Sequence, residues 1–133
     1  MIDKFTVEAV DEMINYLKFN ESGLIPAIAQ QFDTREILML AWMNADSIRS
    51  TIHEKQVCYW SRSRNKLWKK GETSGHTQKL IEFRVDCDND SILLLVDQTG
   101  PACHTNRISC FFQSLSSSGK LNVFIEPSIN RIK

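Results

Sequence analysis

The sequence predicts a single α+β domain that is rich in strands, with mixed or antiparallel sheets and a few short helices. Four apolar runs of strand length, at residues 24–31, 36–42, 77–87 and 91–97, are separated by polar or turn-forming residues. A chain of 133 residues has the size of one ordinary domain, and a hydrophobic content of 42% is enough for a packed core. No repeat or change of composition divides the chain, so residues 1–133 are expected to form one unit.

Two helices are expected in the first half of the chain. Residues 6–18 predict an amphipathic helix that Thr6 can cap. Its apolar positions recur at helical spacing: Val7, Val10, Ile14 and Leu17. The polar segment 33–35 predicts a hairpin turn between the first two strands. A second helix is expected over 45–54, because Asn44 is a favourable cap.

The remaining elements are shorter. Residues 57–60 predict a brief strand, and the polar, basic segment 61–76 predicts a loop. A turn is expected at Gly100–Pro101, followed by a short helix that begins near Thr105. That helix would carry three apolar side chains: Phe111, Phe112 and Leu115. A last apolar segment follows at 121–125.

Charge and cysteine content narrow the function classes. Lysine plus arginine and aspartate plus glutamate each number 16, so net charge favours neither nucleic acid nor a membrane as a partner. The segment Met1–Lys4 lacks the charged and apolar regions of a signal peptide. We therefore expect a cytoplasmic protein with four reduced cysteines, which in that setting more often bind metal or take part in chemistry.

The segment Asp86–Asp90 is the most informative one in the chain. In an extended segment its three carboxylates would share one face and Cys87 would point to the other. The carboxylates belong to alternate residues: Asp86, Asp88 and Asp90. Crowded carboxylates favour a cation among them, and oxygen clusters suit magnesium whereas thiolates suit zinc. A polar turn is the simpler interpretation. A calcium loop is disfavoured, because its sixth position is Ser91 rather than glycine.

Cys103 and Cys110 follow Cys87 and make a second candidate cluster. As free buried residues, cysteines are inert small hydrophobes, which is the default for any one of them. Three thiolates without an obvious fourth ligand would instead suit a catalytic zinc with one position open to water. His104 could be a fourth ligand or a proton carrier, and His76 is another candidate base.

Five cations lie in the segment from Arg62 to Lys70, which follows Trp60 and contains Trp68. A solvated loop is the ordinary interpretation. One functional alternative is single-stranded nucleic-acid binding, by base stacking and phosphate contacts. The other is a pocket for a phosphorylated small molecule. The hydroxyl groups and glycine of Thr73–His76 favour the pocket.

A series of motifs runs in order through residues 24–112. They are Leu38–Asn44, Tyr59–Arg64, Leu67–Trp68, Gly71–His76, Asp86–Asp90, Gly100–Thr105 and Ser109–Phe111. Together they resemble the phosphoribosyl-AMP cyclohydrolase family, which performs a hydrolytic ring opening in histidine biosynthesis. So many motifs in series are far more specific than a lone glycine pattern.

The resemblance implies a set of site residues and an assembly. It makes Cys87, Cys103 and Cys110 ligands of Zn²⁺, and it makes the three aspartates ligands of Mg²⁺. It implies an intertwined homodimer whose zinc site draws cysteines from both subunits, without indicating which cysteine crosses over. The candidates for substrate binding are Trp60, Arg62, Ser63, Arg64, Thr73, Ser74 and His76.

The implied reaction opens the C6–N1 bond of 1-(5-phosphoribosyl)-AMP and gives a formimino imidazole-carboxamide ribotide. Water activated by zinc would attack C6. His104 is the catalytic candidate for the base, and His76 stays open as an alternative. Asn106 stands where many members have glycine, and asparagine tolerates a left-handed backbone better than most residues. Two other functions stay open: a zinc-stabilised module that binds single-stranded nucleic acid, and a deaminase acting on a free nucleoside.

Overall fold

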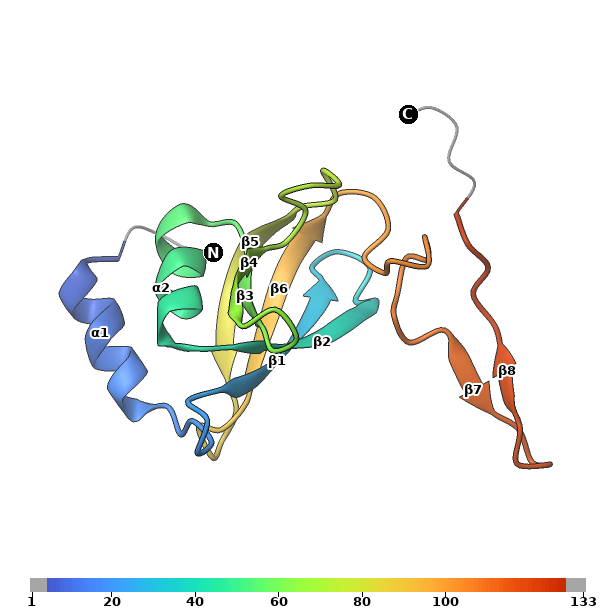
Figure 1. Cartoon of the computed structure of the whole chain (residues 1–133), viewed down its shortest axis with the longest axis horizontal. Helices are drawn as coiled ribbons and strands as arrows, with labels where there is room; N and C mark the ends of the chain where they lie inside the picture. The colour runs from blue at the N-terminus through green and yellow to red at the C-terminus, as the bar shows by residue number, and fades with distance from the viewer. Residues whose placement is uncertain (1–4, 129–133) are drawn as a thin grey trace.

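The computed structural model describes residues 5–128, so the expectation drawn from Met1–Lys4 concerns residues outside it. The described chain is an α+β fold with two helices, a curled mixed sheet and a separate hairpin (Figure 1). The elements, in chain order, are α1 (Val7–Tyr16), β1 (Ile25–Gln31), β2 (Ile37–Met43), α2 (Ala45–Glu54), β3 (Cys58–Ser61), β4 (Lys66–Lys69), β5 (Gln78–Val85), β6 (Ile92–Gln98), β7 (Gln113–Leu115) and β8 (Leu121–Val123). None of the described helices is long and apolar enough to cross a membrane.

Both predicted helices are confirmed, and local capping explains where they begin. The Thr6 hydroxyl accepts a hydrogen bond from the Ala9 amide at 3.0 Å at the start of α1. A capping box between Asn44 and Ser47 opens α2. Lys55 closes α2 in a left-handed conformation with φ 61°. Helix α1 packs against α2, and α2 contacts the sheet (Figure 1).

The main sheet has the strand order β4-β3-β2-β1-β6-β5. The β1–β2 pair is the predicted hairpin. Strands β5 and β6 are also antiparallel, whereas β1 and β6 are parallel, so the sheet is mixed. The sheet curls so that the residues just before β3 pair with β5. Gln56 forms a bridge with Lys79, and the Val57 amide donates to the Gln78 carbonyl at 2.9 Å. This closure brings the end of β4 and the segment after β6 to one side of the fold.

Three expectations were wrong. Strand β4 pairs with β3 inside the segment 61–76, which was expected to be a loop. The segment 105–115 contains no helix: it is irregular up to β7, and its hydrogen bonds go to distant residues such as Leu38, whose carbonyl accepts from the Cys110 amide. Residues 86–91 are a turn rather than an extended segment, with Asn89 at φ 62° and its amide bonded to the Asp86 carbonyl.

Candidate active site

Two cysteines, Cys103 and Cys110, lie in the segment after β6 and are held next to β2. The Cys110 amide donates to the Leu38 carbonyl at 2.7 Å, and the Ser109 hydroxyl donates to the Ile37 carbonyl at 2.6 Å. The Cys103 amide donates to the Arg107 carbonyl at 3.1 Å, which closes a tight loop. These bonds hold Cys103 and Cys110 at the wall of one cavity, where the charge of one thiolate acts on the other.

The two thiols have opposite tendencies to ionise. Burial favours the neutral thiol of Cys103, but hydrogen bonds from Thr105 outweigh it and lower the pKa of Cys103. The Thr105 hydroxyl lies 3.0 Å from the Cys103 sulfur. Burial and the neighbouring Cys103 raise the pKa of Cys110 to about 11. A divalent cation would relieve this repulsion, because it binds both groups as thiolates.

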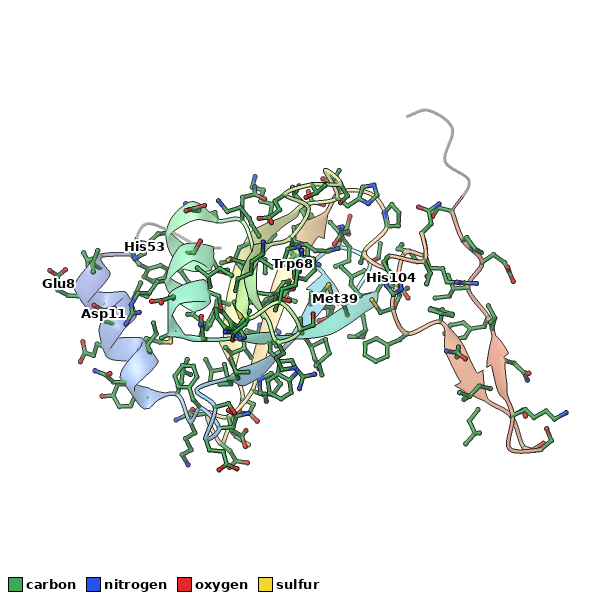
Figure 2. All side chains as sticks on the ribbon, in the orientation of Figure 1. Glu8, Asp11, Met39, His53, Trp68 and His104 are labelled. Carbon is green, nitrogen blue, oxygen red and sulfur yellow. The ribbon has the colours of Figure 1, made fainter. Side chains whose placement is uncertain are left out.

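The thiol pair opens into a cavity of about 560 Å³. It is lined by residues of β2, β4, the 71–76 turn and the segment after β6: Met39, Leu40, Ala41, Trp68, Lys70, Ser74, His76, Pro101, Ala102, Cys103, His104, Asn106 and Cys110. Figure 2 shows the labelled side chains of Met39, Trp68 and His104 in this part of the molecule. The volume is that of an ordinary small-molecule site.

The structure places both candidate bases at this cavity. His104 is exposed, and the His76 side chain is half-buried beside Gly100. A Cβ atom on Gly100 would lie 2.7 Å from Cδ2 of His76, so only glycine allows this ring position. Gly71 is needed as well, because a Cβ there would lie 2.5 Å from the His76 backbone. The turn before β5 therefore fixes His76 closely, whereas His104 is exposed.

A second cavity of about 620 Å³ adjoins the first along Leu40, Ala41 and Trp68, which line both. It contains four of the predicted substrate-binding residues: Trp60, Arg62, Ser63 and Arg64. The Arg62 guanidinium lies 4.8 Å from the centroid of the Trp42 ring. Of the other candidates, Ser74 and His76 line the thiol cavity, and Thr73 is exposed and lines neither.

The three aspartates form a separate cluster, as expected, although a turn rather than strand alternation gathers them. One carboxylate oxygen of each residue lies within 4.8 Å of the others. Hydrogen bonds from the Asp90 and Ser91 amides outweigh partial desolvation and lower the pKa of Asp86. The hydrogen bond with Asp86, and the charges of Asp86 and Asp88, raise the pKa of Asp90. These oxygens fit a hard cation, since a cation would remove the repulsion that raises the pKa of Asp90.

Cys87 does not join the other two cysteines within one chain. It lies exposed in the turn before β6, whereas Cys103 and Cys110 lie in the segment after β6. Among residues 5–128, the aspartates alone make a group of three or more metal-binding side chains at ligand spacing.

Two polar contacts of the thiol cavity were not predicted from the sequence. Thr105 was assigned to a helix start, yet it donates a hydrogen bond to Cys103. Lys70 was counted within the basic segment and given no role of its own, yet it is 7% exposed and lines the cavity. The only signal for Thr105 is its place two residues after a cysteine, and burial of Lys70 follows from the unpredicted strand β4. Asn106 does adopt the left-handed conformation that was expected for it, with φ 67°.

Comparison with known proteins identifies the family of this chain. A profile described as phosphoribosyl-AMP cyclohydrolase matches residues 39–112, which include both cavities and both clusters. The phosphoribosyl-AMP cyclohydrolase of Acidiphilium cryptum is 62% identical over 107 residues, which cover 80% of this chain and 92% of the relative. Those of Granulibacter bethesdensis and Paracoccus denitrificans are 54% and 63% identical, covering 91% and 74% of this chain and 94% and 82% of the relatives. The chain belongs to the phosphoribosyl-AMP cyclohydrolase family, a family of hydrolases, as its motifs indicated.

Proposed function

We propose that this chain hydrolyses phosphoribosyl-AMP by opening the C6–N1 bond of its purine ring, as a step of histidine biosynthesis. The observation that carries the proposal is that Cys103 and Cys110 line one cavity of about 560 Å³ together with two histidines. Family membership supports the enzyme over the nucleic-acid-binding module.

Cys103 and Cys110 are proposed to bind Zn²⁺. These residues fit the ion, because thiolates are preferred zinc ligands and both thiols line a cavity with room for water. The pKa of Cys103 is lowered, which favours its thiolate form. Zinc held by thiolates lowers the pKa of a bound water molecule. His104 or His76 then accepts a proton from the water that attacks C6, and returns a proton to N1 as the C6–N1 bond breaks. Arg62 and Arg64 would bind phosphate in the adjoining cavity.

A third thiolate is proposed to come from a second copy of the chain, so that the active protein is a homodimer with shared zinc sites. Cys103 and Cys110 pair within one chain, and Cys87 is exposed in a different turn. Of the three cysteines, Cys87 is therefore the one that would cross over. The separate turn that holds Cys87 carries this assignment, since Cys110 is exposed as well.

The C-terminal arm, residues 113–123, supports dimerisation. It is a two-stranded hairpin that extends away from the sheet (Figure 1), and such a hairpin is marginally stable alone in water. Leu115, Leu121 and Phe124 are 71%, 62% and 61% exposed. The arm begins just after Cys110, so a second copy that reaches the zinc site would also meet these apolar side chains.

We propose that Asp86, Asp88 and Asp90 bind Mg²⁺. Support comes from the carboxylate oxygens that lie within 4.8 Å of one another. Because Cys87 lies in the same turn, the proposed dimer would bring this ion near the zinc site of the other subunit. Magnesium there could bind a phosphate group of the substrate. The cytoplasmic location stays a prediction.

One assay tests the proposed reaction. Purified protein is incubated with phosphoribosyl-AMP and magnesium, with and without a zinc chelator, and ultraviolet absorbance and ammonia are followed. We expect a new absorbance from the opened imidazole carboxamide, no ammonia, and loss of turnover with the chelator. Ammonia release would indicate a deaminase instead, and turnover that the chelator leaves unchanged would refute the role of zinc.

A further inference from the structure

Lys70 is a buried lysine at the wall of the thiol cavity. It follows β4 directly and is 7% exposed. Its Nζ donates a hydrogen bond to the Ala102 carbonyl at 2.8 Å and lies 5.4 Å from the centroid of the Trp68 ring. Its backbone amide donates to the Val57 carbonyl at 3.0 Å. Lys70 thus links the sheet to the loop that carries Cys103.

No carboxylate among residues 5–128 forms an ion pair with Lys70. The neighbouring Lys69 differs, because its Nζ lies 2.6 Å from Glu54 and its side chain is 44% exposed. An ammonium group buried with only a carbonyl and a ring is costly unless negative charge lies nearby. Burial lowers the pKa of Lys70, and the groups that oppose this shift are Cys110 and Cys103, whose thiolates would stabilise its charged form.

The charges of the proposed zinc site match this arrangement. A Zn²⁺ ion with three thiolates has a net charge of minus one, which is unfavourable in a partly buried cavity. One ammonium group at the same wall makes the site neutral. The side chain that supplies it is fixed by Trp68 and Ala102 rather than by either cysteine.

We infer that Lys70 is a positioning residue that neutralises the thiolate site and anchors the Cys103 loop through the Ala102 carbonyl. This inference rests on the proposed zinc site. Lys70 lies at the wall of the cavity that Cys103 and Cys110 line, so its positive charge would offset the net negative charge of a zinc ion held by three thiolates and tighten metal binding. The hydrogen bond fixes Ala102, the residue next to Cys103, against the sheet.

The test measures zinc affinity by competition with a chromophoric chelator. Lys70→Met removes the charge and the donor but keeps the apolar stem, and it should weaken zinc binding roughly ten- to hundred-fold. Lys70→Arg keeps both and should stay close to wild type. Lys70→Gln keeps an amide donor without the charge, and it should behave like Lys70→Met. Lys69→Met is the matched control and should leave zinc affinity unchanged.

The outcomes separate this inference from the proposed function. If wild-type protein binds no zinc at its thiols, the proposed site fails, and with it the basis for the inference. If wild type binds zinc and Lys70→Met binds it equally well, the inference alone is overturned. Wild-type affinity in Lys70→Gln would overturn the role of the charge.

A second measurement needs no neutral variant. In wild-type protein labelled with ¹⁵N-lysine, the ammonium resonance that disappears in Lys70→Arg should shift when zinc is added. An unchanged Lys70 resonance in zinc-loaded protein would overturn the inference even if Lys70→Met does not fold.

Discussion

A subunit-mixing experiment follows directly from the separation of Cys87 from the other two cysteines. Cys87→Ser and Cys103→Ser proteins are each expected to be inactive, because every zinc site in either homodimer lacks one ligand. In a mixed dimer, one site combines the intact Cys103 and Cys110 of the first chain with the intact Cys87 of the second. The other site lacks two ligands.

The expected recovery can be calculated from this geometry. Equal mixing with free subunit exchange makes half of the dimers mixed, and each has one intact site out of two, so about a quarter of wild-type activity returns. The assay is the absorbance change with phosphoribosyl-AMP after mild denaturation and refolding of the mixture. A mixture of Cys103→Ser with Cys110→Ser is the matched control, because both lesions fall on the same half of a site and no intact site can form. Absence of recovery in the first mixture, or recovery in the control, would refute the shared site.

Four further variants test other parts of the structure. Asp88→Asn should weaken the magnesium dependence of activity and leave zinc content unchanged; an unaltered magnesium titration would count against the aspartate site. His104→Ala should slow turnover with zinc retained, and loss of zinc would instead make His104 a ligand or a structural support. Gly100→Ala should displace the His76 ring and lower kcat, and it should cost about 1 kcal/mol of unfolding free energy for the left-handed backbone. Gly75→Ala is the control, because Gly75 has a similar left-handed backbone but a Cβ there would meet no other atom within 4 Å. An equal loss of kcat in both variants would contradict the role of the His76 ring. Replacing the arm leucines by aspartate should shift the protein toward monomer in sedimentation, and an unchanged mass would argue against the arm as a dimer contact.

Local patterns predicted the elements whose hydrogen bonds are local. Both helices carry their own capping residues, Thr6 and Asn44, and both hairpins have polar turns between apolar runs. Strand β4 could not be read in the same way, because Lys66–Lys69 is short, basic and half-exposed, and its pairing with β3 supplies most of its order.

In the segment after Cys103, a helix was predicted that does not form. Phe111, Phe112 and Leu115 have a spacing that a helix would suit, but they never form one. Instead the Phe112 carbonyl accepts a hydrogen bond from the Phe124 amide, and Ser109 bonds back to β2. Long-range bonds of this kind override local spacing and are not visible in the sequence.

The candidate site was predicted in composition more fully than in arrangement. The motifs identified the thiols, the aspartates and the histidines, but the aspartates gather through a turn at Asn89 rather than through strand alternation. Strand β6 separates the turn that carries Cys87 from the segment that carries Cys103 and Cys110, so the isolation of Cys87 follows from the fold and not from its spacing in the sequence. The burial of Lys70 depends on β4, which was not predicted, so the position of Lys70 at the cavity wall could not be predicted either.

The most direct test of the shared zinc site is a crystal structure of the zinc-loaded protein with anomalous diffraction recorded at the zinc edge. We expect an anomalous peak bonded to Cys103 and Cys110 of one chain and to Cys87 of a second chain. A peak that only one chain coordinates, or a zinc-loaded and active crystal with no peak at these sulfur atoms, would contradict it.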